Sequence, residues 1–79
     1  MIVIKKADIG TISKVKKFVH LNNQTALTVD VGEGRYIVDG KSILGIFSLD
    51  LSAPVSVTVE SDNQQAIDEY FNSIEEFIV

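Results

Sequence analysis

The sequence predicts a two-layer α+β fold, in which a mainly antiparallel four-stranded sheet is covered on one face by three helices. Three observations predict it. Some segments alternate apolar and polar residues, as half-buried strands do. Others repeat apolar residues at helical spacing. The two kinds follow one another in the order β-α-β-β-α-β-α, so each strand with one apolar face has a helix available to cover it.

The first strand and helix occupy the first quarter of the chain. Ile2-Val3-Ile4 is a short β-branched run typical of a strand. From Thr11 to about Asn22 the spacing becomes helical, and Thr11 or Ser13 is suited to cap the start of that helix. The face expected to be buried carries Ile12, Val15, Val19 and Asn22, with Phe18 beside it.

A hairpin is predicted next. Residues 26–31 alternate cleanly between apolar and polar side chains. Gly32-Glu33-Gly34 follows as the expected turn, because two of its three residues tolerate positive φ. Tyr36-Ile37-Val38 then returns as the partner strand.

The second half of the sequence predicts a short helix, a strand and a longer helix. The short helix runs from Ser42 to Leu49 with Ser42 as its N-cap, and residues 55–60 alternate as a half-buried strand. Ser61 and Gln64 match a capping box that opens the last helix. The apolar stripe of that helix consists of Ile67, Tyr70, Phe71, Ile74 and Phe77/Ile78.

Composition limits the classes of function. The 79 residues, 46% hydrophobic and 23% charged, fit one globular domain over 1–79 with no linker or repeat. Without cysteine and with a single histidine, the chain offers no thiolate chemistry and no usual zinc ligand set. The net charge of −4 argues against direct binding of nucleic acid. We expect no metal and no cofactor.

The N-terminus does not look like a targeting signal. Its apolar run of three residues precedes Lys5 and Lys6, whereas a secretory signal places charge first. No stretch approaches the roughly 18 apolar residues of a membrane span. We therefore expect a cytoplasmic protein without a membrane partner.

Residues 41–49, Lys-Ser-Ile-Leu-Gly-Ile-Phe-Ser-Leu, closely resemble the second-helix signature of the histidine-containing phosphocarrier family, HPr. That family serves the bacterial phosphoenolpyruvate-dependent sugar phosphotransferase system. Phe18-Val19, the strand Leu27-Thr28-Val29, the last helix, the element order and the length are also similar. The resemblance implies a single domain with the open-faced sandwich of that family.

The resemblance fails at the start of the first helix. Family carriers have Gly-Leu-His-x-Arg-Pro-Ala there, and the histidine accepts the phosphoryl group. Residues 9–15 keep only Gly10 and, loosely, Lys14, and the stretch Thr11, Ile12, Ser13 holds no histidine. Phosphoesters of Thr11 or Ser13 are too stable for rapid relay. We therefore predict that the carrier function is lost and that the protein is not an enzyme, similar to the catabolite-repression variant of the family.

His20 does not replace the missing histidine. It is the only imidazole and falls near the C-terminal end of the first helix, where the helix dipole disfavours a phosphate.

Ser42 is the candidate regulatory site. In Gram-positive members of the family the serine at this position is phosphorylated by a dedicated serine kinase, and the product binds a transcriptional repressor. The residues that follow, Ile43, Leu44 and Phe47, cannot all point inward from a short helix, which predicts an apolar docking patch. Lys14 and Lys17, with Lys16, form a basic cluster suited to steering acidic partner proteins.

Alternative readings stay open at this point. Ser42 is also an ordinary cap, and the lysines an ordinary solvated face. The chain is alternatively a phosphocarrier with a non-standard acceptor, or a protein-binding module that needs no phosphorylation. A small-molecule site is the weakest alternative, because the core is small. The sequence leaves the oligomeric state open.

Overall fold

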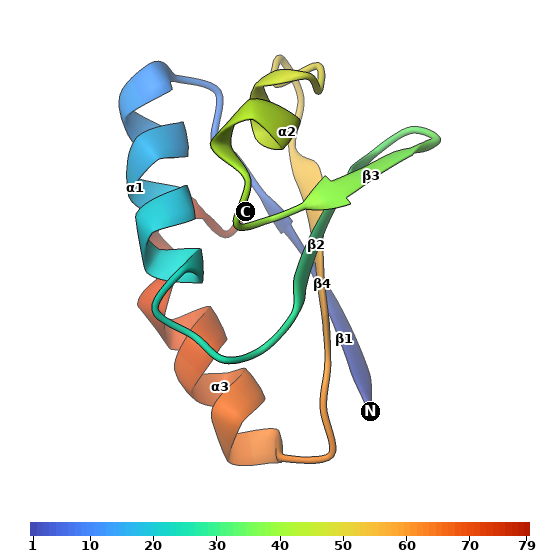
Figure 1. Ribbon diagram of the computed structural model, residues 1–79, viewed down its shortest axis with the longest axis vertical. Helices are drawn as coiled ribbons and strands as arrows, with labels where there is room; N and C mark the ends of the chain where they lie inside the picture. The colour runs from blue at the N-terminus through green and yellow to red at the C-terminus, as the bar shows by residue number, and fades with distance from the viewer.

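Four antiparallel strands form one sheet in the order β1-β4-β2-β3 (Figure 1). The computed structural model describes all residues, 1–79. The strands are β1 (Ile2–Ala7), β2 (Val29–Glu33), β3 (Tyr36–Asp39) and β4 (Val55–Glu60). The helices are α1 (Ile12–Asn22), α2 (Ile43–Phe47) and α3 (Gln64–Ser73), followed by the 3-10 turn η1 (Glu75–Phe77). The predicted element order and α+β class are confirmed.

The register of the sheet places the alternating valines on one face. Val59 of β4 lies opposite Val3 on one side and Val29 on the other, and Val57 lies opposite Val31. These β2 and β4 valines are buried, whereas Thr58 and Asp30, one residue along, belong to the uncovered face. The period-two alternation in the sequence therefore marks the covered face correctly.

Helices α1 and α3 gather on the covered face of the sheet (Figure 1). Their apolar stripes meet the strand valines in a single core. The rings of Phe18 and Phe77 meet edge to face, with centroids 5.9 Å apart. The buried hydrophobic helix residues are Val15, Phe18, Val19, Ile46, Ile67, Tyr70 and Phe71.

The β2–β3 hairpin differs from the prediction. Strand β2 begins at Val29 rather than at residue 26, because Thr25 Oγ1 accepts a hydrogen bond from Leu27 N and holds a turn there. Gly32 lies within the strand opposite Ile37, so it is not part of the turn. The chain turns at Gly34, the one residue with positive φ (58°), and at Arg35, since a two-residue turn needs this conformation.

Two helix starts also differ from the prediction. The cap of α3 is Asn63, whose side chain accepts a hydrogen bond from Ala66 N, and Ser61 instead accepts one from Asn63 N. Ile12, expected on the buried face of α1, is 66% exposed. As the first residue of the helix it lies beyond the area that the sheet and α3 cover.

Candidate functional site

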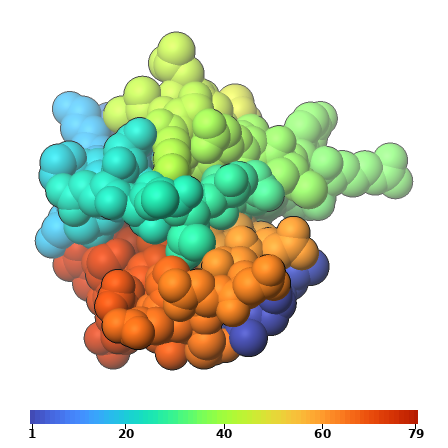
Figure 2. Space-filling view, turned by 60° about the horizontal axis from the view of Figure 1, so that its bottom comes forward, coloured from blue at the N-terminus to red at the C-terminus, as the bar shows by residue number.

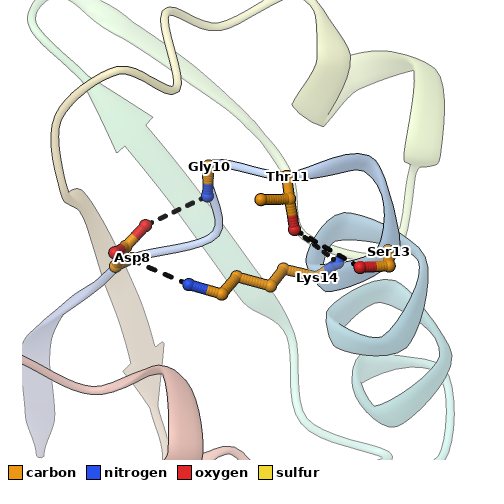
Figure 3. Close-up of polar contacts among 5 residues, drawn as sticks. All are labelled: Asp8, Gly10, Thr11, Ser13 and Lys14. Carbon is orange, nitrogen blue, oxygen red and sulfur yellow. Dashed lines mark hydrogen bonds and ion pairs between the residues drawn. The ribbon is translucent and has the colours of Figure 1, made fainter.

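The start of α1 is a capped helix end with one exposed ion pair (Figure 3). Thr11 is the N-cap, and its Oγ1 accepts a hydrogen bond from Lys14 N at 3.2 Å. One carboxylate oxygen of Asp8 accepts from Gly10 N at 3.1 Å, and the other lies 3.7 Å from Lys14 Nζ. Local polar groups thus fix this loop, and the expected Thr11 cap is observed.

This helix end holds no group suited to phosphoryl relay. The Oγ atoms of Thr11 and Ser13 lie 3.4 Å apart, and neither hydroxyl contacts a base that would activate it. Ile12, between them, has an inert side chain. His20 is eight residues further along α1, about 12 Å by the helical rise, with its Nε2 3.1 Å from Gln24 Nε2.

Ser42 caps α2 in the way the sequence predicts. Its Oγ accepts a hydrogen bond from Gly45 N at 3.1 Å, and its carbonyl accepts one from Ile46 N. The residue is half-buried. The helix is shorter than the predicted 42–49 and ends at Phe47. Ser48 N is shared between the carbonyls of Leu44 and Gly45, and Leu49 N bonds to the Ile46 carbonyl, only three residues back.

Helix α2 exposes an apolar surface that we call the α2 patch: Ile43, Leu44 and Phe47. They are 36%, 80% and 42% exposed, respectively, while Ile46 is fully buried and anchors the helix. Gly45 permits the close fit of α2 on β3, because a Cβ there would lie 3.3 Å from Val38 Cβ. These exposures agree with the expectation that the three residues cannot all point inward, because one turn of helix cannot bury all its apolar residues.

A polar network fixes the segment that leads into Ser42. The buried Asn22 donates from Nδ2 to the Gly40 carbonyl at 2.7 Å and accepts from the Tyr70 hydroxyl at 2.6 Å. Burial raises the pKa of Tyr70, so the hydroxyl keeps its proton and remains a donor. Asn23 Nδ2 donates to the Lys41 carbonyl at 3.2 Å, and Lys41 Nζ donates to the Thr25 carbonyl at 2.8 Å.

Sequence reasoning missed this positioning role of Asn22. The available signal was an amide at an apolar position of the first helix, since a buried amide needs partners.

The two helix starts lie at the same end of the molecule (Figure 1). Helices α1 and α2 are in contact, and the loop after α2 passes so close to Gly10 that a Cβ there would lie 3.0 Å from Leu51 O. The basic cluster is partly neutralised: Lys14 faces Asp8, and Lys17 Nζ lies 2.8 Å from Glu76 Oε1.

The candidate residues line no cavity. The largest hollow, about 440 Å³, lies on the uncovered face of the sheet around Gly32, Ser56 and Pro54. No group of three or more His, Asp or Glu side chains is placed to hold a metal ion. None of the helices has the length and apolar character needed to cross a bilayer.

Comparison with solved structures identifies the fold. The crystal structure of a phosphocarrier protein HPr from Bacillus anthracis superposes with a TM-score of 0.70, covering 91% of this chain and 95% of that one, at 22% sequence identity. The fold is that of HPr. The crystal structure of HPr-C-His from Thermoanaerobacter tengcongensis gives a TM-score of 0.68 and 26% identity, covering 96% and 92% of the two chains.

Sequence comparison finds no match, in contrast to structure comparison. No family model matches the chain, and no curated protein matches it. The HPr-like fold is thus shown by the arrangement of strands and helices.

Proposed function

We propose that this protein is a non-catalytic regulatory or docking protein of the HPr type, related to the phosphoenolpyruvate-dependent sugar phosphotransferase system. The observation that supports it most is the α2 patch directly beside Ser42: Leu44 is 80% exposed on a helix that Ser42 caps and that the buried Ile46 anchors. An exposed apolar cluster on a fixed element is suited to a protein partner.

The absence of an acceptor supports a role other than phosphoryl relay. Counted from Gly10, the histidine of the family pattern Gly-Leu-His corresponds to Ile12. An alkyl side chain cannot form the labile N–P bond that relay needs. The hydroxyls on either side serve as a cap and as its neighbour.

Ser42 is proposed as the switch. Phosphorylation there adds close to two negative charges immediately next to the α2 patch. Ser42 is half-buried, and its Oγ already accepts a hydrogen bond from Gly45 N. A partner with an apolar surface and an adjacent arginine would then distinguish the two forms. This fits the serine kinase and transcriptional repressor that the resemblance implies, with components of the phosphotransferase system as further partners.

Parallel labelling tests the proposal. Purified protein is incubated with phosphoenolpyruvate and the first enzyme of the sugar system, or with ATP and the serine kinase, and its intact mass is measured. We expect a single phosphate from ATP only, lost in Ser42→Ala and kept in Ser48→Ala, the matched serine at the other end of α2.

Three other outcomes would each contradict a part of the proposal. Acid-labile label from phosphoenolpyruvate would restore a carrier with a non-standard acceptor and contradict the proposal. ATP label that persists in Ser42→Ala would contradict the choice of serine. No label in either reaction, with a partner still bound through the α2 patch, would make the protein a binding module that needs no phosphorylation.

A further inference from the structure

The outer edge of strand β3 is open over residues 36–38, and at its end the Asp39 carbonyl accepts a hydrogen bond from Ser42 N at 3.0 Å. The sheet ends at β3, whose Tyr36 and Ile37 are 71% and 73% exposed. Figure 2 shows the tip of the β2–β3 hairpin standing clear of the rest of the molecule. The strand carries no lysine or proline, the residues that usually protect a sheet edge from pairing.

The opposite edge of the sheet is protected. Backbone groups near the end of β1 are bonded to the C-terminal residues: Asp8 N donates to the Phe77 carbonyl at 2.7 Å, and Val79 N donates to the Lys6 carbonyl at 3.0 Å. Lys5 and Lys6 also place charge on that edge strand. Edge pairing is therefore favoured at β3.

The hydrogen-bond pattern determines which β3 groups face outward. Gly40 N donates to the Val29 carbonyl, so Gly40 and, by alternation, Val38 and Tyr36 direct their backbone groups toward β2. The backbone N–H and C=O of Ile37 consequently point away from the sheet. Ile37 makes no bond to any loop or helix.

The charges near this edge lack an ion-pair partner within the chain, and the one hydrogen bond to them runs from Lys41 N to Asp39 Oδ1, at 2.9 Å. Asp30 and Asp39 lie directly opposite each other on neighbouring strands, and like charges in that position repel. Neither aspartate forms an ion pair, and neither does Arg35. A cation supplied from outside the chain would relieve the repulsion.

We propose that two copies of this chain associate through antiparallel pairing of their β3 strands about a two-fold axis at Ile37. Outward-facing residues must oppose outward-facing residues, so Ile37 opposes Ile37 of the second copy and exchanges both backbone hydrogen bonds with it. In this register Arg35 opposes Asp39 of the second copy, and the same pair forms twice. Tyr36 opposes Val38, an aromatic and β-branched pair.

Other registers do not set these opposite charges against each other. A shift by two residues in either direction sets Arg35 or Asp39 against Ile37. Only the register centred on Ile37 matches opposite charges and supplies the missing cation to the Asp30 and Asp39 pair. The contact is a short one, below the roughly 1,200 Å² of stable interfaces, so association is expected to need high protein concentration.

Complementary charge variants test the register. Arg35→Glu places acidic side chains opposite each other, and Asp39→Lys places basic ones there, so each variant alone should remain monomeric. Their equimolar mixture restores two opposite-charge pairs and should associate again. Sedimentation velocity from about 10 µM to about 1 mM follows this, a range suited to a weak contact.

Circular dichroism confirms that each variant folds, and Leu44→Ala, outside β3, should associate like the parent chain. A parent chain that is monomeric throughout this range would overturn the proposal. So would a charge-variant mixture that shows no rescue, or loss of association in Leu44→Ala.

A single cysteine gives an independent readout, because the chain has none of its own. Residues in a hydrogen-bonded antiparallel pair have Cα atoms about 5.5 Å apart, within disulfide range. Ile37→Cys should therefore form a cross-linked dimer under mild oxidation at least tenfold faster than Tyr36→Cys, an equally exposed neighbour that faces Val38 instead. Equal rates for the two variants would overturn the proposed register.

Discussion

The starts of α1 and α2 share one geometry and differ in their surroundings. Thr11 accepts a hydrogen bond from the backbone three residues on at 3.2 Å, and Ser42 does the same at 3.1 Å. Around Thr11 the neighbours are charged and mutually paired, as Asp8 and Lys14 are. Around Ser42 they are apolar and exposed. A hydroxyl cap is therefore not informative by itself, and its neighbours decide what the helix end can do.

The two helices also depend on different sources of stability. Helix α1 has eleven residues and buries Val15, Phe18 and Val19 in the core. Helix α2 has five residues, too few to form by local propensity. It is held by the buried Ile46 and by the polar network of Asn22 on the segment before it. The proposed docking surface thus relies on contacts far away in the sequence.

Asn22→Leu is expected to give the largest effect, a loss of about 2–4 kcal/mol in the free energy of unfolding. The substitution keeps similar volume but leaves the Gly40 carbonyl and the Tyr70 hydroxyl buried without partners. Urea unfolding measures it. The matched control is Asn23→Ala, whose exposed amide should cost about 1 kcal/mol or less. A cost below 1 kcal/mol for Asn22→Leu would show that α2 does not need this network.

If the proposed serine kinase or repressor docks on the α2 patch, Leu44→Ala is expected to weaken its binding by about 10- to 100-fold while leaving stability nearly unchanged. Leu44 is 80% exposed, so the folded protein loses little when it is truncated. Ile12→Ala, which removes an exposed side chain at the other helix start, is the matched control and should change affinity by less than about threefold. Biolayer interferometry compares the two. Equal losses would mean that both helix starts contact the partner.

Most of the fold was predictable because its signals are local. Alternating valines in β2 and β4 and the apolar stripe of α3 specify which faces are buried, and the order of elements then limits the arrangement. The errors lie where several local choices compete. Ser61 and Asn63 are both good caps, and the backbone selects Asn63. Gly32 and Gly34 both tolerate a turn, and pairing with β4 keeps Gly32 in the strand.

The candidate site was predictable only in part. Ser42 and the exposed residues after it follow from a cap and a short helix, both readable along the chain. The hydrogen bond from Asn22 to the Gly40 carbonyl joins residues eighteen apart in the sequence, and the one from Tyr70 to Asn22 joins residues forty-eight apart. No periodicity reports such contacts. The juxtaposition of two carboxylates likewise emerges only when the register sets Asp30 of β2 opposite Asp39 of β3.

Thr11→Ala and Ser42→Ala should each cost about 1 kcal/mol, the usual value of a lost N-cap bond. Equal costs are expected because the two caps have the same geometry and each satisfies one backbone N–H. Thermal unfolding of the two variants side by side measures this. A cost for Ser42→Ala more than twice that of Thr11→Ala would show that the serine does more than cap the helix, even without phosphate.

Lys14→Met should give the smallest effect, about 0.2–0.5 kcal/mol, and that effect should shrink further in high salt. Both members of the Asp8–Lys14 pair are about half exposed and their charged atoms lie 3.7 Å apart, so water screens the attraction. Methionine keeps most of the aliphatic stem, which separates the charge from the packing. Urea unfolding at low and at about 1 M salt, with Lys16→Met as the unpaired control, tests this. A loss above 1 kcal/mol, or one that salt leaves unchanged, would mean that Lys14 organises the start of α1 by more than an exposed ion pair.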